Sequence, residues 1–467
     1  MAVRFTEEEI LEATGGRKVA PAVSTPVMEA VCTDSRRIVP GCLFVALEGE
    51  RFDGHAFITQ AMEQGAGAAL VKAGKPLPTL LPGFGVIEVK DTLVGLGGLG
   101  HYQRRRFQMP VGAVTGSNGK TTTKEMVASI LETRGPALKT EGNLNNEVGV
   151  PLTLFRLVPS HVAAIIEMGM NHAGEIARLT EIVEPEAGVI TTIQPAHLKG
   201  LGSIDGVANA KGELFRGLRK DATAVVNVDD LRIVGQARIS RAQQLTFGRL
   251  EEADVRVVEV KSRGREGMVV FIRCDGRTHE IPMSFVGEHN AMNAAAAFAL
   301  AMALGYGAGE CVSGLTAARP HSQRLNVLDA PGGITVLDDC YNANPASMVA
   351  ALKTLDSLSQ GGRAVAVLGD MLELGDKEAR EHEILGEMAA AHVKLLAFFG
   401  ERSAEGHRAA TSLGDNSAHF TDVEQLVGWL KPQLREGDVV LVKGSRGMRL
   451  ERVVEALTGT SSAGGGH

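Results

Sequence analysis

The sequence predicts an α/β protein of three domains. Its 467 residues are too many for one domain of the usual size, about 100 to 200 residues. From residue 109 onward, short apolar strands alternate with helical segments, a pattern typical of mainly parallel sheets that are covered on both faces. We expect a first domain at residues 1–108, a central domain at 109–324, a third domain at 325–458, and a disordered tail of small and polar residues at 459–467.

The first domain is expected to contain short strands, such as one at Cys42–Leu47, and a helix at Ala56–Gly65. It ends in the basic run HYQRRRF at residues 101–107, which we interpret as a solvated helix face. The chain begins with the acidic, amphipathic segment MAVRFTEEEI, and no apolar stretch of about 18 residues occurs in the sequence. This pattern predicts a cytoplasmic protein without membrane insertion.

The central domain opens with an apolar strand, a glycine turn and a helix in the segment 111–126. Gly116 and Gly119 let the backbone bend where a side chain would collide with an anion, and the first amides of the helix point toward a bound phosphate. Lys120 then supplies a cation to the terminal phosphates, and the hydroxyl of Thr121 is placed to bind magnesium. The alternative is a helix N-terminus with an exposed lysine, which requires all these features to coincide by chance.

Polar residues that follow apolar strands are the next candidates, because open parallel sheets bind ligands beyond the carboxyl ends of their strands. Glu167 closes the strand VAAIIE and either holds magnesium or caps a helix. His197 follows the strand AGVITTI, and a lone histidine is more often a surface or core residue than a ligand. Lys211 lies in the helical stretch GVANAKGELF, where an exposed surface lysine is the default interpretation.

The pattern changes at residues 254–286, where polar and β-branched residues alternate, and this predicts an antiparallel appendage. An alanine-rich helix is expected at Asn290–Leu304. The third domain then repeats the α/β pattern with the strands ITVLDDC, RAVAVLGD, KLLAFFG and DVVLVKGS.

The charge, aromatic content and cysteine pattern of the sequence indicate which kinds of partner the protein is not expected to bind. The net charge of −7 and the aromatic content of 4% argue against nucleic-acid binding. The five cysteines are scattered without paired metal spacing, which fits reduced thiols in a cytoplasm and no zinc site. No heptad repeat or separate apolar stripe favours self-association, so we expect a monomer.

Six segments carry a family resemblance. They are TGSNGKTTTKEM (115–126), TEGNLNNEVGVPLTL (140–154), IIEMGMNHAGEI (165–176), AHLKGLGS with AKGELF (196–215), GEHNAMNAAAA (287–297) and DDCYNANPASM (338–348). In this order they strongly resemble the Mur ligases, the ATP-dependent amide-forming enzymes of peptidoglycan precursor synthesis. Together with TDSRRIVPGCLFVALEGERFDGH (33–55), they are most similar to the member that joins D-alanyl-D-alanine to UDP-N-acetylmuramoyl-tripeptide.

The resemblance implies a first domain that binds the uridine nucleotide, a central P-loop ATPase, and a Rossmann-like third domain that brings the amino substrate. It implies ATP and Mg²⁺ as cofactors, with Mg²⁺ held by Thr121, Glu167, His197 and, if it is carbamylated, Lys211. The implied catalytic residues are Lys120, Glu167, His197 and Lys211.

The resemblance also implies the residues that bind each substrate. Ser35 and Arg36 would contact the uridine nucleotide, and Asn143, Asn145 and Asn146 would also bind substrate. ATP would be bound by Thr115, Gly116, Ser117, Asn118, Gly119, Lys120, Thr121, Asn290, Asn293, Arg324, Asp339, Tyr341 and Asn342. For Asn290, capping of the helix is the alternative.

The implied reaction follows from the poor reactivity of a carboxylate toward an amine. ATP activates the tripeptide carboxylate as an acyl phosphate, and the amine of the dipeptide then attacks it. Arg324 and Asp339 are expected to reach the nucleotide only when the third domain swings in. The loops 369–375 and 442–447 either select the acceptor or serve only as turns.

Two other functions stay open. A folylpolyglutamate synthase would share the phosphate loop, the histidine and the lysine, but it should lack the TDSRR and DGH segments that this chain contains. A regulatory protein that uses ATP only to set its domain orientation is the alternative outside the ligases, although the chain keeps every expected site residue.

Overall fold

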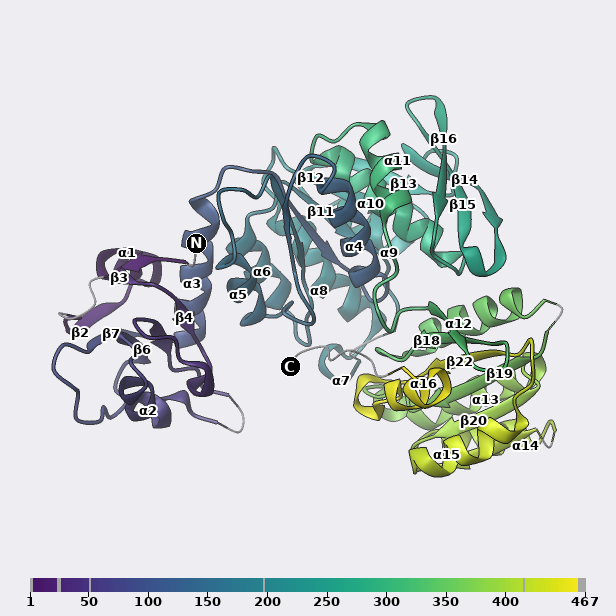
Figure 1. Cartoon of the computed structure of the whole chain (residues 1–467). Coiled ribbons are helices and arrows are strands. Elements are labelled where there is room, and N and C mark those ends of the chain that lie inside the picture. Colours follow the sequence, from purple (N-terminus) through teal and green to yellow (C-terminus); the bar gives the residue numbers. More distant parts are fainter. Residues whose placement is uncertain are drawn as a thin grey trace.

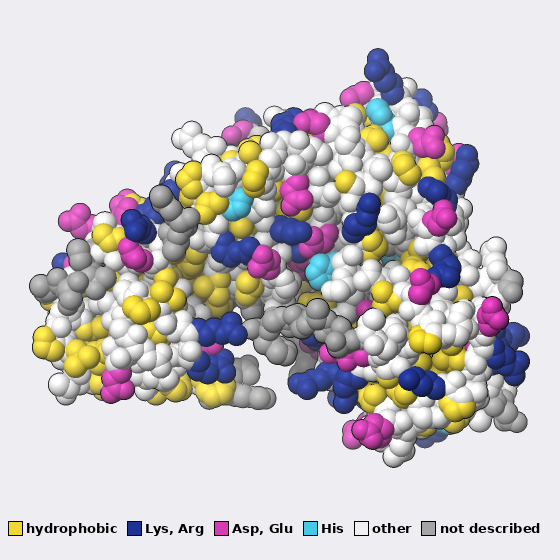
Figure 2. Space-filling model, in the orientation of Figure 1, with side chains coloured by type: hydrophobic (Ala, Val, Ile, Leu, Met, Phe, Trp, Pro, Cys, Tyr) yellow, Lys and Arg dark blue, Asp and Glu magenta, His cyan; other side chains and the backbone are white. Residues whose placement is uncertain are grey.

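The computed structural model describes residues 3–22, 27–49, 52–195, 198–360, 362–414 and 416–460. Three lobes follow one another along the chain (Figure 1), and each has a principal sheet of its own. In the same orientation, Figure 2 shows positive and negative side chains interspersed over the face in view. Two expectations, the position of His197 and the disorder of the tail at 459–467 beyond residue 460, lie outside the described residues.

The first lobe is built on a five-stranded sheet in the order β2-β7-β6-β5-β4. Strands β4 to β7 run parallel, and β2 is antiparallel to β7. The expected strand at 42–47 is β5, and the expected helix at 56–65 is the short 3₁₀ turn η2 followed by α2. The elements are β1 (Phe5–Thr6), α1 (Glu7–Thr14), β2 (Arg17–Ala20), β3 (Val27–Met28), β4 (Val31–Cys32), η1 (Ser35–Arg37), β5 (Leu43–Val45), η2 (Gly54–Phe57), α2 (Ile58–Glu63), β6 (Ala68–Lys72), β7 (Gly85–Val89) and α3 (Thr92–Arg105).

The basic run that ends α3 is not simply a solvated helix face. Arg104 is only 6% exposed, and it donates to the Val183 carbonyl oxygen at 3.0 Å and to Glu186 Oε1 at 2.9 Å. Glu186 Oε2 in turn accepts from the Val111 amide at 2.7 Å. Arg104 therefore joins the first lobe to the central sheet, a role that local sequence does not reveal because its partner lies 82 residues away.

The central lobe contains a nine-stranded sheet in the order β16-β15-β14-β13-β12-β11-β8-β10-β9. Strands β8 to β14 are parallel, and β15 and β16 continue the sheet as the expected antiparallel appendage. The strands are β8 (Val111–Thr115), β9 (Ala137–Lys139), β10 (Ala163–Glu167), β11 (Ala187–Ile190), β12 (Thr223–Asn227), β13 (Gln243–Gly248), β14 (Val255–Ser262), β15 (Met268–Cys274) and β16 (Arg277–Met283).

Helices cover both faces of the central sheet, and each face has its own apolar core. One core joins the sheet to α4 (Lys120–Leu131), α10 (His289–Ala303) and α11 (Ala308–Ala317). The other joins it to α5 (Gly149–Leu154), α6 (Glu175–Val183), α8 (Ile204–Gly217) and α9 (Leu231–Ala237). The short helices are α7 (Leu198–Leu201) and the 3₁₀ turn η3 (Gly264–Glu266). This layering is the one that alternating apolar strands and amphipathic helices predict.

The third lobe has a six-stranded sheet in the order β17-β18-β22-β19-β20-β21, parallel except for β17. Helices α12 to α14 pack on one face, and α15 and α16 pack on the other. The α/β fold class is therefore confirmed. The elements are β17 (Asn326–Ala330), β18 (Ile334–Asp339), α12 (Pro345–Leu358), β19 (Ala364–Gly369), η4 (Gly375–Lys377), α13 (Glu378–His392), β20 (Leu395–Phe399), α14 (Ala404–Thr411), β21 (Ser417–Phe420), α15 (Val423–Leu430), η5 (Lys431–Gln433), β22 (Val439–Lys443), η6 (Arg446–Met448) and α16 (Glu451–Thr458).

Candidate functional site

The turn between β8 and α4 has the geometry of an anion cradle. Gly116 and Gly119 have φ angles of +150° and +82°, which side chains rarely adopt. A Cβ on Gly116 would collide with the Thr191 hydroxyl, and one on Gly119 would collide with the Asn293 side-chain oxygen. Both glycines are needed here, because the loop passes directly against neighbouring polar groups.

A cavity of about 540 Å³ lies between this loop and the third lobe. It is bordered by the phosphate loop, the ends of β10 and β12, the start of α10, and the loop after β18. Of the residues expected at the site, those that line it are Ser117, Asn118, Gly119, Lys120, Thr121, Asn143, Asn145, Asn146, Glu167, Lys211, Asn290, Asn293, Arg324, Asp339, Tyr341 and Asn342. The structure thus brings together side chains that lie more than 200 residues apart.

Four of the expected residues that the structure describes do not line this cavity. Thr115 is fully buried beneath the loop, where its hydroxyl donates to the Met168 carbonyl oxygen at 2.8 Å. Gly116 contributes its bend but no lining surface. Ser35 and Arg36 belong to the first lobe, where Arg36 pairs with Asp34 and holds the pKa of that carboxyl at about 2.

Glu167 ends β10, which is the neighbour of β8 in the sheet. Its amide donates to the Thr140 hydroxyl at 2.9 Å, and its Oε1 accepts from Asn145 Nδ2 at 2.9 Å. Its Oε2 is buried and has no hydrogen-bond partner in the described part of the chain. The helix-capping alternative for Glu167 is wrong, since α6 is capped by Gly174. A fixed carboxylate with one free oxygen is suited to binding a hard cation such as Mg²⁺.

Lys211 is not a surface lysine. It lies on the inner face of α8 and is 1% exposed. Burial and the nearby charge of Lys120 lower the pKa of Lys211 well below its usual value. Burial and Lys120 thus both disfavour the protonated form of the Lys211 amine.

Positive charges converge on the phosphate end of the cavity. The pKa of Lys120 is lowered by burial and by Arg324, while the carboxylate of Glu167 opposes that shift. Lys120 Nζ donates to the Gly116 carbonyl oxygen at 2.8 Å. Lys120 and Arg324, beside the first backbone amides of α4, favour an anionic ligand such as phosphate at this end of the cavity.

Asn290 and Asn293 lie within α10, one turn apart, and both line the cavity. Asn293 donates to Asn290 Oδ1 at 2.8 Å, and Asn290 donates to the Val286 carbonyl oxygen at 2.8 Å. The capping alternative for Asn290 is wrong, because the N-cap of α10 is Glu288.

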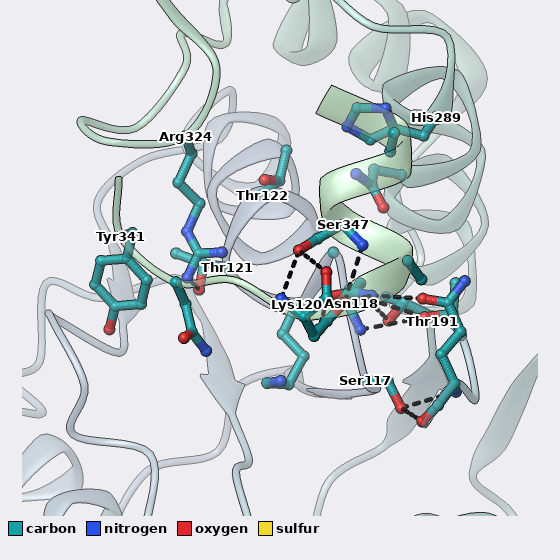
Figure 3. Close-up of a pocket in the computed structure, with 18 of the residues that line it drawn as sticks. Ser117, Asn118, Lys120, Thr121, Thr122, Thr191, His289, Arg324, Tyr341 and Ser347 are labelled. Carbon is teal, nitrogen blue, oxygen red and sulfur yellow. Dashed lines mark hydrogen bonds between the residues drawn. The ribbon is translucent and has the colours of Figure 1, made fainter. Parts of the chain in front are cut away.

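The third lobe already contacts the phosphate loop. Arg324 Nη2 donates to the Thr121 hydroxyl at 3.0 Å, and its guanidinium lies 4.2 Å from the centre of the Tyr341 ring. Figure 3 shows this arrangement and the start of α12 close to Asn118. Asn118 and Asn344 exchange side-chain hydrogen bonds of 2.8 and 3.2 Å. The expectation that Arg324 arrives only after a domain movement does not describe this arrangement, in which Arg324 already contacts the phosphate loop.

Several residues that line the cavity were not identified from the sequence. Lys443 is one of them, and its Nζ forms an ion pair of 2.6 Å with Oδ2 of Asp339, which was expected at the site. Asn227 ends β12 and Asp229 lies just beyond it, so the rule that selected Glu167 would have found them too. Other lining residues come from loops and helix starts whose approach is decided by the tertiary fold: Asn171, Glu175, Thr191, Thr192, Gln194, His289 and Asn344.

These features define a class of protein. A glycine-rich loop between a strand and a helix of a parallel sheet, a carboxylate with a free oxygen beside it and a third lobe that contributes to the same cavity are features typical of a nucleotide-dependent enzyme with more than one substrate. In the part of the chain that the structure describes, no helix is both long and apolar enough to cross a bilayer.

Comparisons with known proteins agree with this class. Three family descriptions match the chain: "Mur ligase family, catalytic domain" at residues 28–89, "Mur ligase middle domain" at 114–301, and "Mur ligase, glutamate ligase domain" at 323–446. The chain is 39% identical to the UDP-N-acetylmuramoyl-tripeptide–D-alanyl-D-alanine ligase of Escherichia coli strain K12, over 92% of this chain and 94% of that protein. The chain therefore belongs to the Mur ligase family.

Solved structures give the same result. The crystal structure of MurF from Acinetobacter baumannii matches with a TM-score of 0.89 and 34% identity, over 98% of this chain and 100% of that one. MurF ligase from Thermotoga maritima, solved in complex with ADP, matches with a TM-score of 0.83 and 27% identity, over 92% and 97% of the two chains. The family resemblance seen in the sequence is thereby confirmed over nearly the whole chain.

Proposed function

We infer that this chain is an ATP-dependent amide ligase that joins D-alanyl-D-alanine to UDP-N-acetylmuramoyl-tripeptide and releases ADP and phosphate. The supporting similarity to ligases of this activity extends over more than nine-tenths of the chain. The structural observation that carries the inference is the single cavity that joins a phosphate loop, a free carboxylate oxygen and residues of the third lobe.

The reaction needs an activated carboxylate, because a carboxylate itself is a poor acyl donor. In our proposal the tripeptide carboxylate attacks the γ-phosphate of ATP, and Lys120 and Arg324 stabilise the charge on the transferring group. The amine of the dipeptide then attacks the resulting acyl phosphate, and the tetrahedral intermediate collapses to the amide and phosphate. Much of the rate would come from holding three substrates at reacting distance.

Thr121, Glu167 and Lys211 would hold Mg²⁺, and His197, which lies outside the described residues, would join them. Bound Mg²⁺ would neutralise phosphate charge. The donor set fits the ion at Glu167, whose Oε2 is buried without a partner. It fits at Lys211 only if the amine carries a carbamate, since an ammonium would repel the cation.

We propose that residues 1–108 bind the uridine nucleotide through Ser35 and Arg36, that residues 109–324 bind ATP, and that residues 325–458 bring the dipeptide. Asn143 and Asn146 would contact the peptide substrate, while Asn145 has a second task because it holds Glu167. The protein would act as a cytoplasmic monomer.

The test is phosphate release from ATP and Mg²⁺ with UDP-N-acetylmuramoyl-tripeptide, comparing D-alanyl-D-alanine, lysine, diaminopimelate and no amine as acceptor. We expect turnover with D-alanyl-D-alanine alone. Turnover with a diamino acid would keep the mechanism but change the substrate, and turnover with folate and glutamate would favour a folylpolyglutamate synthase. Failure with every pair would favour the regulatory function.

A further inference from the structure

The segment after β22 carries an arginine, Arg446, close to a residue that lines the cavity. Arg446 follows the strand at the carboxyl edge of the third sheet, and its side chain is 49% exposed. Its guanidinium lies 5.8 Å from the centre of the Tyr341 ring, and Tyr341 lines the cavity. The guanidinium of Arg446 has no role in the reaction proposed above.

Ser445 fixes the backbone from which Arg446 projects. It is 3% exposed, and its amide donates to the Asp370 carbonyl oxygen at 3.0 Å. Its hydroxyl accepts from the Leu372 amide at 3.0 Å and donates to the Ala343 carbonyl oxygen at 3.4 Å. The loops after β18, β19 and β22 therefore form one platform, and Arg446 stands at its edge.

Gln323, next to the boundary between the central and third domains, orients the guanidinium of Arg446. Arg446 Nη1 donates to Gln323 Oε1 at 3.0 Å, and the Tyr341 amide donates to the Gln323 carbonyl oxygen at 3.2 Å. Gln323 has a φ angle of +63°, which non-glycine residues seldom adopt. A backbone conformation of this kind persists when its surroundings hold it, and functional sites are where it is most often found.

Arg446 remains available to an anion, whereas neighbouring cations are committed. Lys443 is almost fully buried and bonds to Asp339 Oδ2 at 2.6 Å and to the Asn342 carbonyl oxygen at 2.9 Å. Arg324 is directed to the phosphate loop. The carboxylate that the structure places near Arg446 is Glu451, at 3.6 Å, which is a loose ion pair at a partly exposed position.

The amino substrate of the proposed reaction has a free carboxylate that does not react. Burying that carboxylate without a cation would oppose binding, and the planar guanidinium can hold it through two parallel hydrogen bonds. We propose that Arg446 binds the carboxylate of the incoming dipeptide and so directs its amine toward the cavity. This inference rests on the proposed function, because it assumes a dipeptide acceptor.

The experiment compares D-alanyl-D-alanine with its C-terminal amide in the wild type and in Arg446→Gln. We expect the substitution to raise the KM for the dipeptide about 30-fold, the typical loss for a hydrogen-bonded charge, and to leave the KM for the amide within about twofold. The preference for acid over amide should therefore largely vanish. Arg446→Lys keeps the positive charge but not the two parallel donors of the guanidinium. Its KM for the dipeptide should therefore lie between those of the wild type and Arg446→Gln.

Arg452→Gln is the matched control, since Arg452 is an exposed arginine on the adjoining helix α16. It should behave as the wild type does. A wild-type preference that survives in Arg446→Gln would overturn the proposal. A rise confined to the KM for UDP-N-acetylmuramoyl-tripeptide would also overturn it, because the guanidinium would then serve a carboxylate of the other substrate.

Calorimetric binding of D-alanyl-D-alanine and its amide, with a non-hydrolysable ATP analogue and UDP-N-acetylmuramoyl-tripeptide present, repeats the comparison without turnover. Binding of the dipeptide that weakens in Arg446→Gln supports the proposal, and unchanged binding contradicts it. A wild type that neither binds nor turns over D-alanyl-D-alanine, but accepts another amine, would instead contradict the proposed function.

Discussion

Lys211 carries its amine to the cavity from α8 although its side chain is almost fully buried. Burial and the charge of Lys120 lower the pKa of Lys211, so both disfavour the protonated form of its amine. An unprotonated amine can add carbon dioxide and release a proton to become a carbamate, which carries a negative charge. The unmodified side chain of Lys211 is a buried cation or a buried amine, and either form destabilises the folded protein. We expect this cost to be accepted for the role of Lys211 in the reaction.

Replacing Lys211 with methionine is expected to raise the midpoint of thermal unfolding and to reduce ligase activity at least about 100-fold. Removal of a poorly compensated buried polar group typically stabilises by about 1 to 3 kcal/mol. Below the usual lysine pKa, the unfolded chain binds a proton that the folded chain binds less readily. Wild-type stability therefore rises with pH toward the unfolded pKa, and the advantage of Lys211→Met should shrink over that range.

The measurement is thermal unfolding from pH 6 to pH 10 in buffer depleted of carbon dioxide. Lys220→Met, a change at an exposed lysine, is the control and should alter neither stability nor activity. Full activity in Lys211→Met would rule out both a carbamate and any other catalytic task for this residue.

At the scale of elements, helix α12 depends on Asn344 at its start. Asn344 Oδ1 accepts from the Ser347 amide at 2.9 Å, and Nδ2 donates to Asn118 Oδ1 at 2.8 Å. One side chain thus caps a helix of the third lobe and ties that helix to the phosphate loop.

Two substitutions separate these tasks. Asn344→Ala removes both and should lower the free energy of unfolding by about 1 kcal/mol, the typical value of an N-cap. Asn344→Ser keeps the cap but is too short to reach Asn118, so it should cost only a few tenths of a kcal/mol. Both should raise the rate of amide hydrogen exchange in residues 116–121 equally. Equal loss of stability in the two variants would show that the cap does not contribute.

The whole molecule depends on how its lobes are joined. Arg104 connects the first lobe to the central lobe through Val183 and Glu186, and it also donates to the nearby Phe107 carbonyl oxygen. The Arg104 side chain is buried, so its removal leaves the carbonyl oxygens of Val183 and Phe107 without this hydrogen-bond donor.

Arg104→Ala is expected to lower the free energy of unfolding by about 1 to 3 kcal/mol and to loosen the first lobe. The KM for UDP-N-acetylmuramoyl-tripeptide should rise, while the KM for ATP should not, because the cavity is built without the first lobe. Small-angle scattering should show a larger radius of gyration. Arg105→Ala, at a more exposed neighbour on α3, is the control; an unchanged radius in Arg104→Ala would contradict the prediction.

Sequence alone was sufficient where the chemistry is local. The phosphate loop was recognisable because the strand, the glycines and the lysine are consecutive, and Glu167 was recognisable because it ends an apolar strand. The antiparallel appendage at 254–286 and the α/β class were predicted from periodicity for the same reason. Each of these features depends on residues within one or two turns or strands of each other.

Only the tertiary structure decided which side chains are buried and which partners they meet. Lys211 and Arg104 look like surface residues in the sequence, but both are buried by segments that are distant along the chain. The contact between Asn118 and Asn344 spans 226 residues, and the one between Arg446 and Gln323 spans 123. Periodicity describes one element at a time, whereas these contacts exist only after separate sheets have packed together, and that is where the functional cavity is formed.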